Sequence, residues 1–183
     1  VGKKAIRIKG ITGSRAEVDV VPAIRLHHVT WLSDANRYQT LEGVAILSTD
    51  GRWTLNFPDQ HAANGRAKRA RTGHQFKRVV RIFKRMQSDM LKSGMLKSKV
   101  PSFLIECLVY CVDDYYFQVP GDDRYGRVQR VAWQMRALLA DRRIAAGLTE
   151  INEIKWLFHS AQAWTYEDAW AFANAAVTYL GDA

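Results

Sequence analysis

The residues of this sequence that could do chemistry are one acid and a row of cations. Asp19 stands at the centre of the stretch RAEVDVVPAIR, which alternates around valines as a β-strand does. A carboxylate in that position is most simply an outward-facing, solvated side chain on a half-exposed strand. The residues around Asp19 do not by themselves identify anything that the carboxylate would bind.

The cations follow one side of an amphipathic helix expected over His74–Leu91. Its apolar residues gather on one side: Phe76, Val79, Val80, Phe83, Met86 and Met90. Lys77, Arg81 and Lys84 form a stripe on the opposite side, with Arg78 and Arg85 beside it. No acid of this segment interrupts the stripe, and like charges four residues apart destabilise a helix slightly. The pattern is equally compatible with an anion site, for polyphosphate or nucleic-acid backbone, and with a solvated outer face.

The net charge of +9 comes from one window of the sequence. Between His61 and Lys99, twelve Lys and Arg stand against one acid, Asp89, so this window carries +11. The remaining residues hold fifteen basic and seventeen acidic side chains, a balance of −2. Such a concentration indicates either an anionic partner or a large solvated surface. Ser102, just inside a helix expected from Pro101, offers a second place for a phosphate oxygen beside free helix amides.

The elements that must position these residues follow an α+β order. The strands are expected over residues 4–9, 17–24 and 43–48, with turns at Thr12-Gly13 and Asp50-Gly51. Pro58 is expected to end the sheet. Four helices follow in the prediction: one to Leu91 after a capping box at Thr72 and Gln75, then Pro101–Val112, Asp123–Ala145 ended by Gly147, and one after Thr165 with Glu167 and Asp168 in its first turn.

The composition is typical of a soluble globular protein, with 48% hydrophobic and 25% charged residues among 183. No apolar run approaches the length of a membrane span, and no basic-then-apolar leader opens the sequence. Cys107 and Cys111 stand four apart in an apolar run without a second Cys or His pair nearby. They are therefore expected to be buried free thiols in a reducing cytoplasm rather than zinc ligands.

Several motifs occur in a characteristic order: EVDVVPAI, FKRVVRIFK, VPSFLIECLVY, INEIKWLF and AWTYEDAWAFANAAVTYLG. Together they resemble the CD-NTases, the nucleotidyltransferases of bacterial CBASS anti-phage systems. These are similar to cyclic GMP–AMP synthase and oligoadenylate synthase within the DNA polymerase β-like superfamily. The resemblance covers nearly the whole chain. It implies a partial nucleotidyltransferase sheet over residues 1–57 and a helical nucleotide-binding region over 58–183, as one truncated domain or two closely packed lobes.

The resemblance also implies an activity and the residues that serve it. In this family carboxylates on the sheet hold two Mg²⁺ ions (Mn²⁺ is an alternative), and nucleoside triphosphates are joined into cyclic di- or oligonucleotide second messengers. Asp19 matches the third of these carboxylates, which makes it a catalytic metal ligand. Lys84 matches a lysine that reaches the phosphates, with Arg81 and Lys77 as its neighbours. Ser102 matches a phosphate-binding serine, and Phe103 an aromatic that stacks on the base, although a core role would also explain Phe103.

One part of the family pattern is missing from this sequence. The first two carboxylates of the family come from an Asp-x-Asp strand preceded by a Gly-Ser loop and a short helix. Gly13-Ser14 followed by Glu17-Val-Asp19 imitates this pattern but leaves no room for the helix. We therefore expect a C-terminal portion that is inactive alone, either as a fragment or beside an N-terminal part on a separate chain. Its expected partners are nucleoside triphosphates, the missing N-terminal part and regulatory CBASS proteins. The alternatives are a basic nucleic-acid-binding module and a nucleotidyltransferase that modifies RNA or protein.

Overall fold

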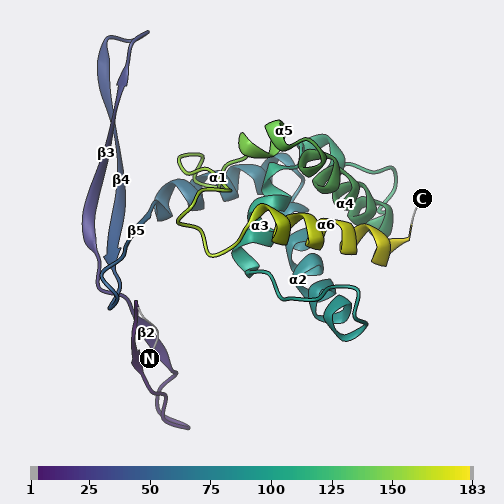
Figure 1. The fold of residues 1–183 in the computed structure, drawn as a ribbon, viewed down its shortest axis with the longest axis horizontal. Coiled ribbons are helices and arrows are strands. Elements are labelled where there is room, and N and C mark those ends of the chain that lie inside the picture. Colours follow the sequence, from purple (N-terminus) through teal and green to yellow (C-terminus); the bar gives the residue numbers. More distant parts are fainter. Residues whose placement is uncertain (1–3, 182–183) are drawn as a thin grey trace. The chain divides into compact units, whose positions relative to one another are not determined.

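The computed structural model describes residues 4–181 of the chain. The chain divides into two compact units, Val1–Asp59 and Gln60–Ala183. Strands make up the first unit and helices the second, so the α+β class predicted from the sequence is confirmed (Figure 1).

The strands of the first unit form two antiparallel sheets. The smaller sheet pairs β1 (Ile6–Ile8) with β2 (Val18–Val20), and the larger one has the order β3–β4–β5. These three strands are β3 (Ile24–Leu32), β4 (Arg37–Leu47) and β5 (Trp53–Asn56). The turns predicted at Gly13 and Gly51 are confirmed, because both glycines have positive φ angles, 77° and 79°.

The sequence prediction was incomplete for the larger sheet. It omitted β3 and β5, and it found only the end of the eleven-residue β4. In β3 the adjacent pair His27 and His28 breaks the apolar–polar alternation on which the prediction relied. Gly43 of β4 is required by close packing, since a Cβ there would lie 2.7 Å from the ring of Phe57.

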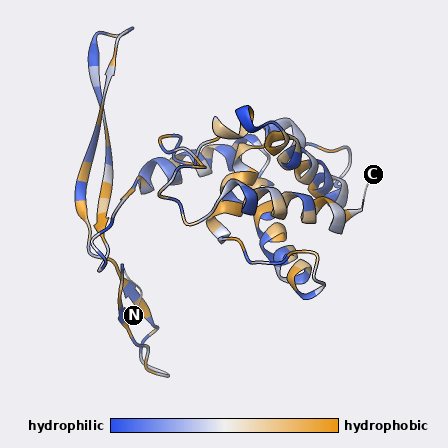
Figure 2. Cartoon of the chain, viewed as in Figure 1, coloured by the Kyte–Doolittle hydropathy of each residue, from blue (hydrophilic) through white to orange (hydrophobic). Residues whose placement is uncertain are grey.

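The predicted helical region from residue 58 contains one more long helix than the four that were named, because the prediction omitted α1 (Pro58–Arg71). Pro58 ends the sheet and is also the first residue of α1, as suits a proline at a helix start. The others are α2 (Phe76–Lys92), α3 (Ser102–Cys111), the 3-10 helix η1 (Asp114–Phe117), α4 (Arg124–Ala140), α5 (Arg142–Ala146) and α6 (Tyr166–Leu180). The apolar helix α3 contributes much of the core, and α2, α4 and α6 pack around it (Figures 1 and 2).

The start of α2 differs from the capping box that the sequence suggested. Gln75 is the N-cap residue and makes no side-chain capping bond. The Thr72 hydroxyl instead donates to the Lys68 carbonyl over 2.8 Å and accepts from the Phe76 amide over 3.1 Å. Thr72 therefore joins the end of α1 to the start of α2. The amphipathic pattern of α2 is confirmed, since all six predicted apolar residues are buried.

The prediction of a single helix over Asp123–Ala145 is wrong, because Asp141 interrupts it and separates α4 from α5. Asp141 has an extended backbone, and its carboxylate accepts a hydrogen bond of 2.8 Å from the Arg143 amide. This side chain starts α5 by the same capping chemistry that Asp123 supplies to α4. The final helix is confirmed, with Thr165 and Asp168 forming a reciprocal capping box.

Both cysteines are free thiols, with Cys107 buried and Cys111 partly buried. Burial raises the pKa of both, that of Cys111 to about 11, so both are protonated at neutral pH. Within residues 4–181 no three His, Cys, Asp or Glu side chains gather as a metal site would require. Nor does that range contain a helix with the length and apolar character of a membrane span.

Candidate functional site

An open hollow of about 630 Å³ follows the cationic side of α2. The apolar side of this helix is buried in the core, which turns the stripe of Lys77, Arg81 and Lys84 outward. All three residues line the hollow. The other lining residues are Arg69, Gly73, His74, Arg78, Val80 and Glu106. Five cations against one carboxylate leave this surface with a charge of +4.

Glu106 on α3 is a member of this surface that the sequence analysis missed. Its carboxylate accepts a hydrogen bond from Lys77, and its Oε2 accepts one of 3.0 Å from Lys84. The Glu106 side chain is only 14% exposed, and the Lys84 side chain is 33% exposed. Glu106 therefore holds two of the three predicted lysine and arginine side chains at a defined spacing.

The electrostatics of the hollow follow from this contact. Burial by itself would raise the pKa of Glu106, but the hydrogen bonds from Lys77 and Lys84 outweigh it and hold the pKa below its ordinary value. Glu106 is therefore ionised at neutral pH. Arg81 is exposed and forms no ion pair with any residue of the range 4–181. Its guanidinium is free to meet an anion.

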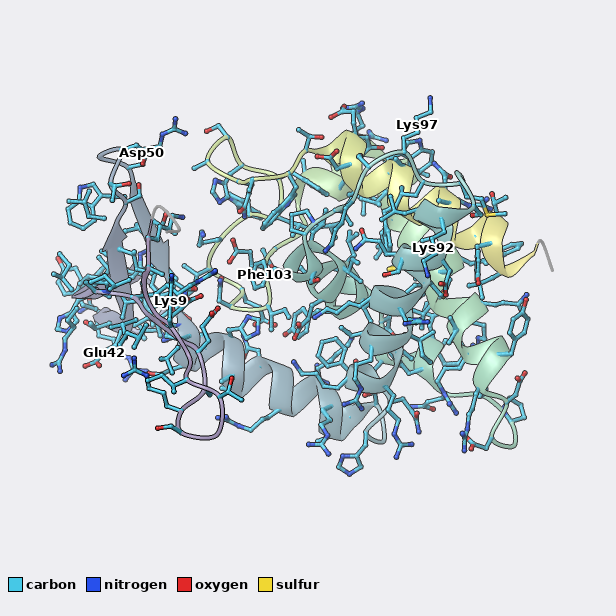
Figure 3. The ribbon with its side chains drawn as sticks, turned by 90° about the horizontal axis from the view of Figure 1, so that it is seen from below. Lys9, Glu42, Asp50, Lys92, Lys97 and Phe103 are labelled. Carbon is cyan, nitrogen blue, oxygen red and sulfur yellow. The ribbon has the colours of Figure 1, made fainter. Side chains whose placement is uncertain are left out.

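Phe103 lies one turn before Glu106 on α3 and belongs to an aromatic group. Its ring stacks on that of His61, with centroids 5.6 Å apart, and lies 5.8 Å from the ring of Trp164. Burial lowers the pKa of His61 in spite of the nearby Glu106, so this ring is neutral at pH 7. Phe103 is half-buried, with part of its ring against the core and part exposed (Figure 3).

Ser102 is the exposed first residue of α3. The preceding N-cap residue is Pro101, whose side chain makes no capping hydrogen bond to the amides of the first turn. Free amides at a helix start attract anions. The phosphate contact that the resemblance implies for Ser102 stays a prediction.

Asp19 lies in the first unit, at the centre of β2 and opposite Arg7 of β1. Its carboxylate is 3.4 Å from the Arg7 guanidinium, and the carboxylate of Glu17 is 3.5 Å from the same group. Both acids are more than half exposed and share one face. Carboxylate oxygens suit Mg²⁺, but a hard dication requires more ligands than Asp19 supplies. Asp19 thus fits one ligand of a larger metal site.

The INEIKWLF segment and the Glu150 side chain just before it are held by several hydrogen bonds. Glu150 is 2% exposed, lies 3.1 Å from Lys155, and accepts hydrogen bonds from Asn152 and Gln162. The Asn64 side chain of α1 donates to the Ile151 carbonyl over 2.8 Å. These contacts fasten the segment to the helix that carries His61.

The Glu106 contacts predict a pH dependence of stability. A carboxyl group with a lowered pKa stabilises the fold above its unfolded-state value, and this stabilisation is lost as the pH falls through the folded-state pKa. We expect Glu106→Gln to lower the free energy of unfolding at neutral pH by about 1–2 kcal/mol, since charged hydrogen bonds are lost. The difference from the unmutated chain should shrink as the pH falls below the ordinary Glu value of 4.5. Urea unfolding at several pH values measures it, and a difference that does not change with pH would contradict the assignment.

The chain combines strands with a helical unit that carries a cationic hollow, and its relatives define the class of protein to which this arrangement belongs. The chain belongs to the cGAS/DncV-like nucleotidyltransferase family, since residues 63–181 match its C-terminal helical domain. It is 36% identical over 169 residues to the cyclic dipyrimidine nucleotide synthase CdnE of Legionella pneumophila, covering 91% of this chain and 54% of that protein. It is 31% identical over 179 residues to a cyclic dipurine nucleotide synthase of Elizabethkingia meningoseptica, covering 97% and 58%.

The fold agrees with this membership. The solved structure of Elizabethkingia meningoseptica CdnE cyclic dinucleotide synthase with GTP and Apcpp aligns with a TM-score of 0.78 and 29% identity. That alignment covers 98% of this chain and 63% of the solved one. The chain spans about half the length of the curated relatives that it matches. The resemblance predicted from the sequence motifs is confirmed.

Proposed function

We propose that this chain is the nucleotide-binding portion of an enzyme that joins nucleoside triphosphates into cyclic di- or oligonucleotide second messengers for bacterial anti-phage (CBASS) signalling. The observation that carries the proposal is the cationic hollow on α2, where Glu106 positions Lys77 and Lys84 beside the unpaired Arg81. Relatives of the chain are cyclic nucleotide synthases by name. A net charge of +4 in an open hollow suits a triphosphate, which carries several negative charges.

Each proposed role follows from the chemistry of the side chain. Lys84, Lys77 and Arg81 contact the phosphates, and Ser102 with the first amides of α3 holds a further phosphate oxygen. Phe103 stacks its exposed ring surface on a base. Asp19 would be one ligand of a Mg²⁺ or Mn²⁺ ion, and such an ion would supply neutralisation of phosphate charge and activation of the attacking hydroxyl. The proposed setting is the bacterial cytoplasm, with regulatory CBASS proteins as further partners.

We expect this chain alone to form no cyclic nucleotide. Two-metal chemistry requires several carboxylates, and Asp19 is the single residue that the family resemblance assigns to the metals. Mass spectrometry of mixtures of the four nucleoside triphosphates with Mg²⁺ and this chain measures the product. The same assay with a chain extended at its N-terminus serves as the positive control. Robust product formation by the 183 residues alone would contradict the expectation.

The binding experiment separates this proposal from a basic nucleic-acid-binding module, which the charge of residues 61–99 also favours. Calorimetric titration with ATP, GTP, CTP or UTP in Mg²⁺ should saturate at one or two nucleotides per chain. A module that grips nucleic-acid backbones should instead prefer a long oligonucleotide, with a salt slope of about 0.9 log units for each phosphate contacted. Weak nucleotide binding together with steeply salt-dependent oligonucleotide binding would reject the proposal. Transfer of a labelled nucleotide to RNA or protein by the extended chain would favour an enzyme that modifies these acceptors.

A further inference from the structure

A second groove, of about 560 Å³, lies between α2 and the start of α4. It adjoins the cationic hollow, because Arg78 and Arg81 line both. Every residue that lines it is an arginine or an apolar residue, apart from Gln75. Its five arginines are Arg78, Arg81, Arg85, Arg124 and Arg127. This composition differs from that of the cationic hollow, which contains two lysines, a carboxylate and a histidine in addition to three arginines.

The arginines of the groove are positioned but only partly neutralised. Arg127 is 7% exposed, and it donates to the Phe117 carbonyl over 2.8 Å and to the Gln75 side chain over 3.4 Å. Arg124 lies 3.0 Å from the exposed Asp122, and the Arg85 guanidinium lies 3.9 Å from Asp89. Arg78 and Arg81 form no ion pair within residues 4–181. Five cations thus face two peripheral carboxylates, which leaves an excess of three positive charges.

The floor of the groove is apolar. Ile82 is 39% exposed. It differs in this from the apolar residues on the opposite side of α2, such as Phe83, which are buried in the core. Val79, Met86 and Val128 also line the groove, but each is at most 6% exposed, so Ile82 supplies most of its accessible apolar side-chain surface. An apolar floor inside a ring of arginines can bury an apolar side chain of a ligand while the guanidinium groups pair with its acids.

We propose that this groove binds a short acidic segment of a partner protein, with one apolar side chain seated on Ile82 and neighbouring carboxylates paired with the arginines. Charge complementarity selects an anion, and the planar guanidinium suits a carboxylate because it forms two parallel hydrogen bonds. A nucleic-acid backbone fits the groove less well, since its sugars and phosphates gain little from the exposed apolar side chain of Ile82. A cavity of this size accommodates a few side chains, as small binding clefts do.

The test measures fluorescence polarisation of a labelled peptide that carries a Leu-Phe pair between two runs of glutamate. A second peptide with Ser-Ser in place of Leu-Phe keeps the charge, and an oligothymidylate represents a nucleic-acid backbone. We expect saturable binding of the first peptide and binding of the second that is weaker by about tenfold or more, as loss of an anchor residue predicts. The oligothymidylate should displace the first peptide poorly at physiological salt.

The variants address residues that line the groove and not the nucleotide hollow. Ile82→Ser should lower the affinity for the Leu-Phe peptide by about tenfold and leave the affinity for the Ser-Ser peptide unchanged. The double variant Arg85→Glu/Arg124→Glu should lower the affinity for both peptides by about tenfold or more. It removes two cations and adds two carboxylates that repel the acidic peptides. Its matched control is Arg66→Glu/Lys97→Glu, which makes the same charge change at exposed positions outside the groove. That control should stay within about threefold, because distant exposed charges are screened.

Nucleotide binding is measured on the same proteins, so the groove and the proposed function can fail separately. Ile82→Ser should bind Mg²⁺–nucleotide as the unmutated chain does, since Ile82 does not line the hollow. Equal binding of the two peptides, or an unchanged affinity in Ile82→Ser, would overturn the proposal. Tighter binding of oligothymidylate than of the Leu-Phe peptide would overturn it in favour of a nucleic-acid surface. Circular dichroism confirms that each variant is folded.

Discussion

Replacement of Lys68 by alanine should lower the free energy of unfolding of the helical unit by about 3–5 kcal/mol, as the loss of one partner of a buried ion pair does. Lys68 is 4% exposed, and its ammonium lies 2.6 Å from the Asp114 carboxylate. It also donates a hydrogen bond to the Val112 carbonyl at the end of α3 and lies 5.3 Å from the Phe117 ring centroid. The ammonium therefore caps the negative end of α3 and neutralises a carboxylate that is largely withdrawn from water.

The alanine variant leaves the Val112 carbonyl and the Asp114 carboxylate with fewer partners. Burial alone would raise the pKa of Asp114, but hydrogen bonds from Lys68 and Arg71 lower it overall. Loss of Lys68 should therefore raise the pH at which acid unfolds the chain, because Asp114 then takes up its proton at higher pH. Urea unfolding followed by circular dichroism at neutral and acidic pH measures both effects.

The controls for Lys68 separate its charge from its packing. Lys97→Ala removes an exposed lysine, so its free energy of unfolding should stay within about 0.5 kcal/mol of that of the unmutated chain. Lys68→Met retains most of the side-chain volume, so it should recover the part of the loss that comes from packing. A Lys68→Ala variant that unfolds at the same urea concentration as Lys97→Ala would show that the ammonium contributes nothing net.

Replacement of Lys84 by alanine should weaken Mg²⁺–nucleotide binding by about 10- to 100-fold, the range expected for one charge-assisted hydrogen bond to a phosphate. Lys84 is partly buried, and Glu106 holds its ammonium at a fixed place in the hollow. A positioned cation loses less conformational entropy on binding than a free lysine does. This result rests on the proposed function, and calorimetric titration measures it.

The matched controls for Lys84 are other lysines and another ligand. Lys97, labelled in Figure 3, lies far along the helical unit from Phe103, and Lys97→Ala should bind nucleotide within about twofold of the unmutated chain. Lys84→Ala should lose about one phosphate contact to a long oligonucleotide. The slope of its log affinity against log salt concentration should therefore be smaller by about 0.9. An unchanged nucleotide affinity in a folded Lys84→Ala variant would remove this lysine from the site. A loss confined to the oligonucleotide would favour a backbone-binding surface.

Some of the candidate site could be predicted because its signals are local. The spacing of Lys77, Arg81 and Lys84 on α2 follows from the helical period, and burial of the apolar side turns them toward one hollow. The family motifs and the start of the last helix after Thr165 were equally visible in the sequence, whereas the capping box that Thr165 forms with Asp168 came from the structure. The split between α4 and α5 was not, because Asp141 is compatible both with a continuing helix and with a new start.

Other features depended on contacts between residues far apart in the sequence. The sequence pattern suggested a stripe without an acid, yet Glu106 reaches Lys77 and Lys84 from another helix. The arginine groove likewise combines residues of α2 with Arg124 and Arg127 of α4.

The sequence by itself thus determined the amphipathic side of α2, the concentration of positive charge and the family. The tertiary structure decided which acid partners those cations and where an apolar floor is exposed. The physical reason is that periodicity and capping act over a few residues, whereas the contacts of a charged side chain depend on how whole helices pack.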